Sequence, residues 1–246
     1  MSFSDDEIER YARHLVLAEI GGPGQQRLKA ARVAIVGMGG VGAPAALYLA
    51  AAGVGALRLI DHDTVGLSNL QRQIVFSEQD VGDLKVEAGA ARLTALNAHV
   101  EIEAAAERLT PDNAAWLLDG CGVVIDGTDD FETRFAVNAA CVAGGIPLVS
   151  GALGRWSGQV GVFAGRPCYR CLVAEAPPDV ETCARVGVVG ALAGVVGSMA
   201  ALEAIKLITG AGEALSGRLL IYDGLAGTAR TVAVAADPAC PVCAAR

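Results

Sequence analysis

Residues 32–61 read RVAIVGMGGVGAPAALYLAAAGVGALRLID, and this stretch decides the fold. Residues 33–36 form a short apolar, largely β-branched run of the kind that makes a buried parallel strand. The run leads into a loop that contains Gly37, Gly39, Gly40 and Gly42. A small-residue helix is expected over 44–52, because proline is tolerated in a first helical turn. A second apolar strand over 57–60 ends at Asp61, 19 residues after Gly42.

This spacing predicts a βαβ unit that binds a mononucleotide. The glycines let the backbone turn sharply and let a ligand approach where no Cβ intervenes. The free N–H groups and positive dipole end of the helix favour phosphate. An acid at the end of the second strand, here Asp61, can bond ribose hydroxyls. The alternative is a tight strand–helix turn that binds nothing.

Composition narrows the class of protein. The 246 residues suit one large α/β domain, and 53% of them are hydrophobic but only 4% aromatic, which predicts a core of small and aliphatic side chains. A formal net charge of −8 argues against a nucleic-acid-binding surface. The acidic N-terminal segment lacks a signal-peptide pattern, so a cytoplasmic location is expected. The uncharged stretch 186–202 is interrupted by glycines, and we expect a buried or interface helix there and no membrane span.

The remaining pattern indicates a Rossmann-like, mostly parallel sheet with helices on both faces. Helices are expected over 5–18, 85–97, 111–118 and 131–142, with a glycine-rich loop at 21–24 before a short helix that ends at residue 29; strands are expected over 100–103, 123–125 and 146–150. Strands at 158–163, 218–222 and 228–234 lack crossover helices and predict an antiparallel extension of the sheet. We therefore expect one domain over 1–246, with N-terminal helices (1–30), a nucleotide-binding half (31–150) and a C-terminal extension (151–246).

A long polar segment follows Asp61. It brings Asn69, Arg72 and, further on, Lys85 beside the glycine loop. So many cationic and amide donors suit a triphosphate better than a pyrophosphate that the helix end already holds. The alternative is that Arg72 and Lys85 are ordinary surface charges.

Three carboxylates follow the strand at 123–125. Asp126, Asp129 and Asp130 lie at the carboxyl end of a parallel strand, where doubly wound sheets bind ligands. They could hold Mg²⁺, which uses one or two carboxylates together with substrate phosphates. For Asp130 the alternative is an N-cap of the next helix.

Four of the seven cysteines form two CxxC pairs, Cys168 with Cys171 and Cys240 with Cys243. Two such pairs supply the four thiolates of a structural zinc site. The alternatives are two redox CxxC motifs, or disulfides in a secreted protein. Cys121 and Cys141 have apolar neighbours and are expected in the core. Cys183 lies in a polar loop near Arg185, which makes it either a nucleophile activated by a nearby cation or an inert loop cysteine.

The chain as a whole resembles the bacterial members of the ubiquitin-activating-enzyme superfamily, the ThiF/MoeB/HesA proteins, and among them most closely the molybdopterin-synthase adenylyltransferase type. The resemblance covers nearly the whole chain, and the most specific motif is Ser-Asn-Leu-Gln-Arg-Gln at 68–73 beside the glycine loop. The other matching motifs are Arg-Tyr-Ala-Arg-His at 10–14, the glycine loop at 37–42, Asp-His-Asp at 61–63, Lys85, Thr-Asp-Asp-Phe-Glu-Thr-Arg at 128–134, Gly-Gln at 158–159, Cys183, and the two cysteine pairs.

The resemblance implies ATP- and Mg²⁺-dependent adenylation of the C-terminal Gly-Gly carboxylate of a ubiquitin-like sulfur-carrier protein. It further implies a homodimer in which Arg13 reaches the triphosphate in the neighbouring subunit, and a Zn²⁺ ion on the four paired cysteines. Cys183 matches the position where some members form a covalent link. The residues predicted to be catalytic are Arg13, Arg72, Lys85, Asp129 (also the Mg²⁺ ligand) and Cys183. The residues predicted to bind the nucleotide are Gly37, Gly39, Gly40, Gly42, Asp61, Asp63, Ser68, Asn69, Leu70, Gln71, Arg72, Lys85, Asp129 and Asp130.

This sequence departs from the family pattern in three places. Asp130 replaces the usual asparagine, and its extra negative charge could add a metal ligand or weaken phosphate binding. Ser157 replaces the usual glutamate before Gly-Gln. The rhodanese domain of some relatives does not follow the second cysteine pair, so sulfur is expected from another protein, such as a separate sulfurtransferase. Two other functions stay open: a nicotinamide-dependent oxidoreductase, which leaves Arg72, Lys85 and Asp129 unexplained, and a non-catalytic relative that only docks a ubiquitin-like partner.

Overall fold

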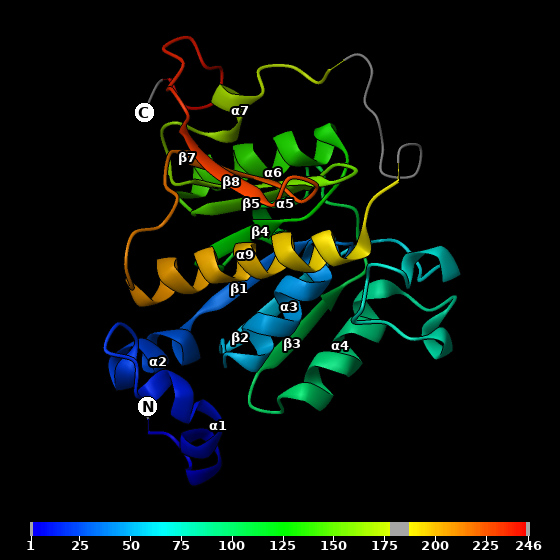
Figure 1. Ribbon diagram of the computed structural model, residues 1–246, viewed down its shortest axis with the longest axis vertical. Helices are drawn as coiled ribbons and strands as arrows, with labels where there is room; N and C mark the ends of the chain where they lie inside the picture. The colour runs from blue at the N-terminus through cyan, green and yellow to red at the C-terminus, as the bar shows by residue number, and fades with distance from the viewer. Residues whose placement is uncertain (1, 178–186, 245–246) are drawn as a thin grey trace.

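The computed structural model, which describes residues 2–177 and 187–244, is built on one eight-stranded sheet in the order β3-β2-β1-β4-β5-β6-β7-β8 (Figure 1). The parallel strands are β1 (Arg32–Val36), β2 (Ala56–Ile60), β3 (Glu101–Ala105), β4 (Val123–Asp126) and β5 (Leu148–Leu153). The antiparallel strands are β6 (Ser157–Phe163), β7 (Arg218–Asp223) and β8 (Thr228–Ala233). The predicted parallel sheet with an antiparallel C-terminal extension is therefore confirmed.

Strand β1 lies at the centre of the parallel part. It pairs with β2 on one side and β4 on the other, so that Val33 lies between Leu57 and Val123. Residues 33–36 of β1 are all buried, which is why they read as a continuous apolar run. The strand order reverses between β1 and β4, and at such a switch point the carboxyl ends of the strands leave a crevice for a ligand.

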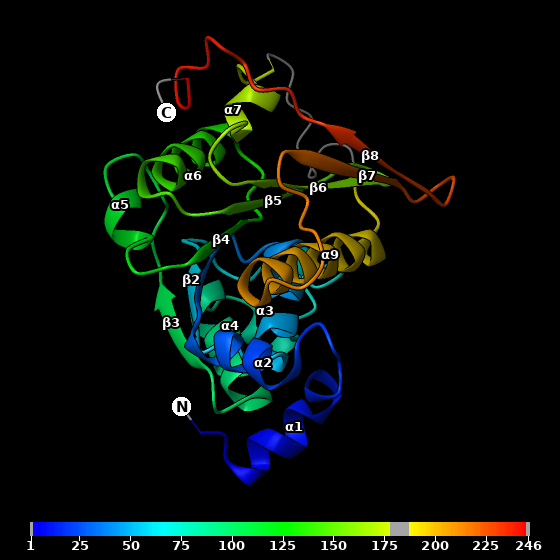
Figure 2. The same ribbon diagram turned by 90° about the vertical axis from the view of Figure 1, so that its left-hand side faces the viewer.

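Helices cover both faces of the sheet. One face carries α3 (Gly42–Ala51), α4 (Lys85–Leu96) and α9 (Gly190–Thr209), and the other carries α5 (Ala114–Leu117) and α6 (Phe131–Gly144) (Figure 2). Side chains alternate between two apolar cores: Ile35 packs into the first, and Ala34 and Val36 pack into the second. The layers thus follow from strand residues that point alternately to each face.

Helix α9 comes from the uncharged stretch near residues 186–202. It begins at Gly190 and ends at Thr209, later than expected, and residue 186 lies outside the described part. Within the described residues it is the one helix that is long and apolar enough to cross a membrane, but 44% of its most apolar window is buried in the molecule. It packs against α3 and against β5 and β6, so its apolar character is explained by the core.

The N-terminal helices confirm one expectation and correct another. In α1 (Asp5–Leu15), Ser4 Oγ accepts from the Glu7 N–H and Glu7 Oε2 accepts from the Ser4 N–H, which is the predicted capping box. The predicted loop at 21–24 is wrong, because helix α2 spans Gly21–Ala30. Tertiary contacts override the low helix propensity of the glycines: α2 packs on α9, and Arg27 donates to the backbone oxygen of Thr209.

A second correction concerns residues 111–118, which form only the short helix α5. Asn113 closes a turn ahead of α5, because its side chain accepts from Thr110 N at 2.7 Å and donates to Arg108 O at 2.9 Å. The polar segment after Asp61 contains two short 3₁₀ helices, η1 (Leu67–Asn69) and η2 (Glu78–Asp80). The short helix α7 (Tyr169–Leu172) and the C-terminal segment lie together at the opposite end of the molecule from the N-terminus (Figures 1 and 2).

Candidate functional site

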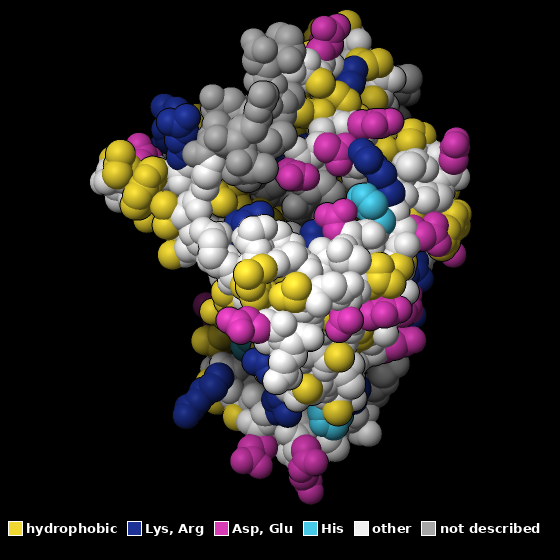
Figure 3. Space-filling model, turned by 90° about the vertical axis from the view of Figure 1, so that its right-hand side faces the viewer, with side chains coloured by type: hydrophobic (Ala, Val, Ile, Leu, Met, Phe, Trp, Pro, Cys, Tyr) yellow, Lys and Arg dark blue, Asp and Glu magenta, His cyan; other side chains and the backbone are white. Residues whose placement is uncertain are grey.

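A pocket of about 460 Å³ opens at the carboxyl ends of the parallel strands, at the switch point between β1 and β4. Its walls come from the glycine loop, the end of β2, the loop after β3, the β4–α6 turn and β5. Basic and acidic side chains gather around a hollow on the face shown in Figure 3. The volume falls within the range of small-molecule sites.

The glycine loop is folded tightly against itself and leaves space above it. Gly37 has φ +86°, and a Cβ on Gly42 would lie 1.9 Å from the Gly37 carbonyl oxygen, so neither position accepts a side chain. A Cβ on Gly39, in contrast, would meet nothing closer than 3.9 Å. The loop therefore presents an open cradle at the N-terminus of the ten-residue helix α3, which suits a phosphate.

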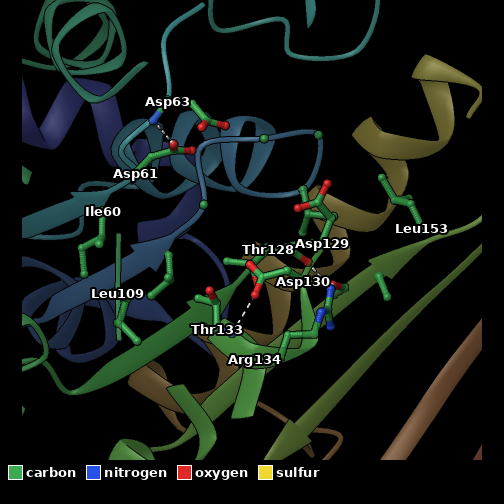
Figure 4. Close-up of a pocket in the computed structure, with 18 of the residues that line it drawn as sticks. Ile60, Asp61, Asp63, Leu109, Thr128, Asp129, Asp130, Thr133, Arg134 and Leu153 are labelled. Atoms are coloured by element: carbon green, nitrogen blue, oxygen red, sulfur yellow. Dashed lines mark hydrogen bonds between the residues drawn. The ribbon is translucent and has the colours of Figure 1, made fainter. Parts of the chain in front are cut away.

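Asp61 and Asp63 lie beside this loop (Figure 4). The Asp61 carboxylate accepts from Met38 N at 2.7 Å and from Asp63 N at 2.9 Å, which leaves acceptor capacity for ribose hydroxyls. Asp63 accepts from Lys85 Nζ at 2.8 Å, and Lys85 itself is buried. Burial raises the pKa of Asp63, but the hydrogen bond and charge of Lys85 outweigh this and hold that pKa below its usual value. The contact with Asp63 thus holds the Lys85 side chain at the pocket wall.

The polar segment after Asp61 divides into residues that reach the pocket and residues that do not. Asn69 and Arg72 line it, as does Lys85. Ser68, Leu70 and Gln71 are not among the lining residues. Ser68 O accepts from Arg72 Nη1 at 3.1 Å, Leu70 packs against the first core, and Gln71 Nε2 donates to Val188 O. The contacts of these three residues therefore hold the polar segment in position and do not face a ligand in the pocket.

The opposite end of the pocket is apolar. Ile60 and Leu109 lie near each other on one side of the pocket in Figure 4, and Phe131 also lines the pocket. An apolar surface next to Asp61, the acid predicted to bind ribose, suits a nucleobase.

The three carboxylates of the β4–α6 turn have different environments. Asp126 is 1% exposed, and its oxygens are occupied by Thr128, by Ser150 Oγ and by Arg134. Asp130 caps α6 by accepting from Thr133 N at 2.8 Å, and Arg108 lies 3.4 Å from it. Asp129 is exposed to the pocket, and within the described residues it has no hydrogen bond or ion pair. Mg²⁺ ligation by Asp126 was therefore a wrong expectation, because its oxygens are saturated, and Asp129 remains the carboxylate that fits the ion.

Arg134 is a pocket residue that the motifs contained but sequence reasoning did not single out. It is 6% exposed and donates to the carbonyl oxygens of Thr128 and Gly151. Burial lowers the pKa of its guanidinium, but the adjacent Asp126 carboxylate outweighs burial and raises it. Arg134 is therefore a permanent buried cation that ties the β4–α6 turn to β5.

Gln73 is a second such residue. It is 4% exposed, it lines the pocket, and among the described residues its buried Oε1 has no hydrogen-bond partner. Its Nε2 lies beside the space above Gly39, where this amide group could donate to a polar ligand. Its place at the end of Ser-Asn-Leu-Gln-Arg-Gln was the signal that could have identified it.

The four paired cysteines come together as predicted. Their Sγ atoms lie within 4.8 Å of one another, with Cys168 to Cys240 at 3.7 Å and Cys171 to Cys243 at 3.4 Å. These distances are close to the edge of about 3.8 Å expected for four thiolates at 2.3 Å from one zinc ion. All four are free thiols, so the disulfide alternative does not apply. The donor set is compatible with zinc.

The structure places one of the other two predicted catalytic residues, Arg13, away from the pocket. Arg13 is exposed in the last turn of α1 and does not line the pocket of its own chain. Cys183 lies outside the described residues. As expected, Cys121 and Cys141 are buried in the second core.

Comparisons with known proteins agree with this geometry. The chain is 46% identical to the SAMP-activating enzyme E1 of Haloferax volcanii, over 99% of this chain and 91% of that protein. It is 44% identical to the sulfur carrier protein adenylyltransferase of Thermus thermophilus, over 99% of this chain and 93% of that protein.

Among solved structures, E. coli MccB with AMPCPP and MccA superimposes with a TM-score of 0.81 and 25% identity, over 95% of this chain and 74% of that one. The model of the ThiF family matches residues 11–242, which include the glycine loop, the pocket and three of the four paired cysteines, Cys168, Cys171 and Cys240. On this match and these identities, the chain is a member of the ThiF family.

Proposed function

We propose that this protein activates the C-terminal Gly-Gly carboxylate of a ubiquitin-like sulfur-carrier protein by ATP-dependent adenylation. The observation that carries the proposal is one pocket in which a glycine cradle, Asp61 and the cations Arg72 and Lys85 face the unpaired carboxylate Asp129. The Haloferax and Thermus relatives carry names of this activity and align over nearly the whole chain.

The reaction requires positioning and charge neutralisation. A carboxylate oxygen of the carrier attacks the α-phosphorus of ATP, and the bond to the oxygen bridging the α- and β-phosphates breaks. Pyrophosphate leaves with the electron pair of that bond, and the carrier is left as an acyl-adenylate. Negative charge grows on the leaving group, so cations aligned in advance lower the barrier and adenylation needs no protein nucleophile.

Different residues of the pocket bind different parts of ATP in this proposal. Asp61 holds the ribose, and the apolar side chains of Ile60 and Leu109 contact the base. The α3 N-terminus and Lys85 lie towards the phosphates, with Arg72 beside them. Mg²⁺ bound by Asp129 would supply further positive charge to the departing pyrophosphate.

The active unit in this proposal is a homodimer. Arg13 is exposed and does not line its own pocket, which leaves it available to the pocket of a partner subunit. Val16 and Leu17 follow it with 78% and 45% of their surface exposed, and such apolar residues suit a covered interface. We further propose that the four cysteines hold a structural Zn²⁺ and that the protein is cytoplasmic. Cys183 can take the carrier from the acyl-adenylate as a thioester, with AMP as the leaving group, and a separate sulfurtransferase supplies the sulfur.

Two features weigh against the other functions. A nicotinamide-dependent oxidoreductase would not need Asp129 and the basic wall. The docking-only alternative depended on the extra charge of Asp130, but Arg108 and the α6 N-terminus already offset that charge.

ATP–pyrophosphate exchange with a panel of Gly-Gly-ending sulfur carriers tests the proposal. We expect exchange with at least one carrier, reduced by about 100-fold or more in Arg72→Ala, since a transition-state donor is lost. Arg92→Ala, which removes an exposed arginine of α4 outside the pocket, is the matched control and stays within about twofold. Absence of exchange with every carrier, in a protein that binds ATP and holds zinc, would establish the docking-only function instead.

A further inference from the structure

Tyr169 stands between the cysteine cluster and the nucleotide pocket. It follows Cys168 directly in the chain, is 4% exposed and lines the pocket. The N-cap residue of α7, Cys168, therefore belongs to the cluster, and the first residue of the helix, Tyr169, belongs to the pocket wall. Because the two residues are adjacent in the chain, a displacement of Cys168 in the cluster would also displace Tyr169 in the pocket wall.

Asn138 of α6 fixes the position of α7. Its Oδ1 accepts from Tyr169 N at 2.8 Å, and its Nδ2 donates to Cys168 Sγ at 3.6 Å. The side chain is 1% exposed, so both ends of the amide are committed to these two neighbours. A thiolate that accepts such a bond keeps its orientation towards a metal. The same asparagine thus orients a metal ligand and the residue that lines the pocket.

The ring of Tyr169 packs against the buried cation Arg134. The Arg134 Cζ atom lies 5.9 Å from the ring centroid, and Phe163 meets the same ring edge-on at 5.7 Å. Burial raises the pKa of the Tyr169 hydroxyl, and the charge of Arg134 partly offsets that rise. A desolvated cation over an aromatic ring is the stronger form of this contact.

Arg134 in turn holds the pocket wall in shape. Its guanidinium donates to Gly151 O at 2.8 Å, to Thr128 O and to Ser150 Oγ at 3.2 Å. Figure 4 shows Arg134 below Thr128 and Asp129. Asp129 follows Thr128 directly. The guanidinium therefore sets where the β4–α6 turn presents Asp129 relative to β5.

We infer that Tyr169 is a positioning residue for the nucleotide site, and that metal binding by the cysteine cluster is coupled to nucleotide binding through Asn138, Tyr169 and Arg134. The inference rests on the proposed nucleotide site and adds a regulatory input to it. Loss of the metal would release α7, loosen the ring under Arg134 and shift the turn that carries Asp129. By linkage, a nucleotide must strengthen metal binding by the same factor as the metal strengthens nucleotide binding.

Substitutions at Tyr169 test the packing step. We expect Tyr169→Leu to bind a fluorescent ATP analogue about tenfold more weakly, because the ring under the cation is lost, and Tyr169→Phe to stay within about twofold. Exchange kinetics should show the loss in the KM for ATP more than in kcat. Arg170→Ala is the matched control, since Arg170 lies in the same helix α7, stacks on Phe135 at 4.2 Å and does not line the pocket.

Zinc content separates positioning from collapse of the cluster. Tyr169→Leu with a full zinc complement and wild-type nucleotide affinity would overturn the inference, as would an equally large loss in Arg170→Ala. Asn138→Ala is the second variant, and we expect it to bind nucleotide more weakly and to release zinc to a chelator faster. If this variant keeps both the nucleotide affinity and the zinc-release rate of the wild type, the coupling is contradicted.

The wild-type protein gives a test that needs no variant. Its zinc affinity is measured by competition with a chelator, with and without a saturating non-hydrolysable ATP analogue in excess Mg²⁺, after correction for the zinc that the analogue itself binds. We expect several-fold tighter zinc binding with the analogue, and equal affinities would refute the coupling. A wild-type protein that binds no nucleotide at all would instead refute the proposed function, so the two failures are distinguishable.

Discussion

The two ends of the sheet hold their functional atoms by different physical means. In the parallel half, buried strands such as β1 and two apolar cores fix the pocket, and its side chains come from loops close to those strands. In the C-terminal part, β8 is exposed along its whole length, and the apolar cluster around the four thiols adds only Val142 as a buried non-cysteine residue. The first region is held by hydrophobic burial, whereas the second would depend on the zinc coordination proposed for the four cysteines. The following changes should distinguish these two sources of stability.

The largest effect is expected from breaking the cysteine cluster. Cys243→Ser should abolish zinc binding and release the segment after β8, while the parallel half stays folded, because no apolar core replaces the lost metal bonds. Metal analysis and limited proteolysis with mass mapping would show this. Cys141→Ala removes a buried cysteine outside the cluster and should keep the full zinc content. Global unfolding of Cys243→Ser would show that both regions depend on the metal.

Within the parallel half, Asp126→Asn should cost the most stability, about 3–5 kcal/mol, since it leaves the buried guanidinium of Arg134 without its counter-charge. Denaturant unfolding measures this cost. Asp129→Asn is the matched variant: it should leave the free energy of unfolding unchanged and remove Mg²⁺-dependent exchange. Equal destabilisation by the two changes would contradict the assigned environments.

Two alanine substitutions in the glycine loop should differ in kind. Gly42→Ala forces a Cβ to within 1.9 Å of the Gly37 carbonyl and should destabilise the fold by about 1–3 kcal/mol, together with loss of nucleotide binding. Gly39→Ala meets no protein atom closer than 3.9 Å, so it should fold normally and lose only nucleotide affinity. Thermal unfolding measures the stability of both variants, and nucleotide titration measures their affinity. A Gly42→Ala protein that is as stable as the wild type and binds nucleotide would contradict the structural role assigned to Gly42.

The smallest effect is expected at Asp130. Asp130→Asn should change stability by no more than about 1 kcal/mol, because asparagine caps a helix as well and the ion pair with Arg108 is half exposed. Chemical denaturation at low and at high salt would measure this change. A larger loss at low salt only would show that the ion pair, and not the cap, holds the turn.

The parts of the fold that follow from short-range patterns could be predicted from the sequence. The β1–α3–β2 unit and the capping box at Ser4 are local, and each was placed within a few residues. The end of helix α2 was also placed within one residue, but its first turn was predicted as a loop, because the glycines there favour a loop and only packing on α9 makes them helical. Asp126, Asp129 and Asp130 carry the same signal in sequence, yet strand pleat and capping give them three environments. Asn138 and Tyr169 gave no signal, since their contacts join segments about 30 residues apart.

The spacing of the two cysteine pairs has one more consequence. Cys171 and Cys240 are the inner members of the pairs, so a bound metal closes residues 172–239 into a ring that contains α9, β7 and β8. A cross-link over a ring of this size removes about 4 kcal/mol of chain entropy from the unfolded state, by analogy with a disulfide. A single proteolytic cut within the ring would leave one cysteine pair on each fragment, so a bound metal would still link the two fragments. The cleaved, zinc-loaded protein should therefore remain one complex, and the fragments should separate only after a chelator removes the metal.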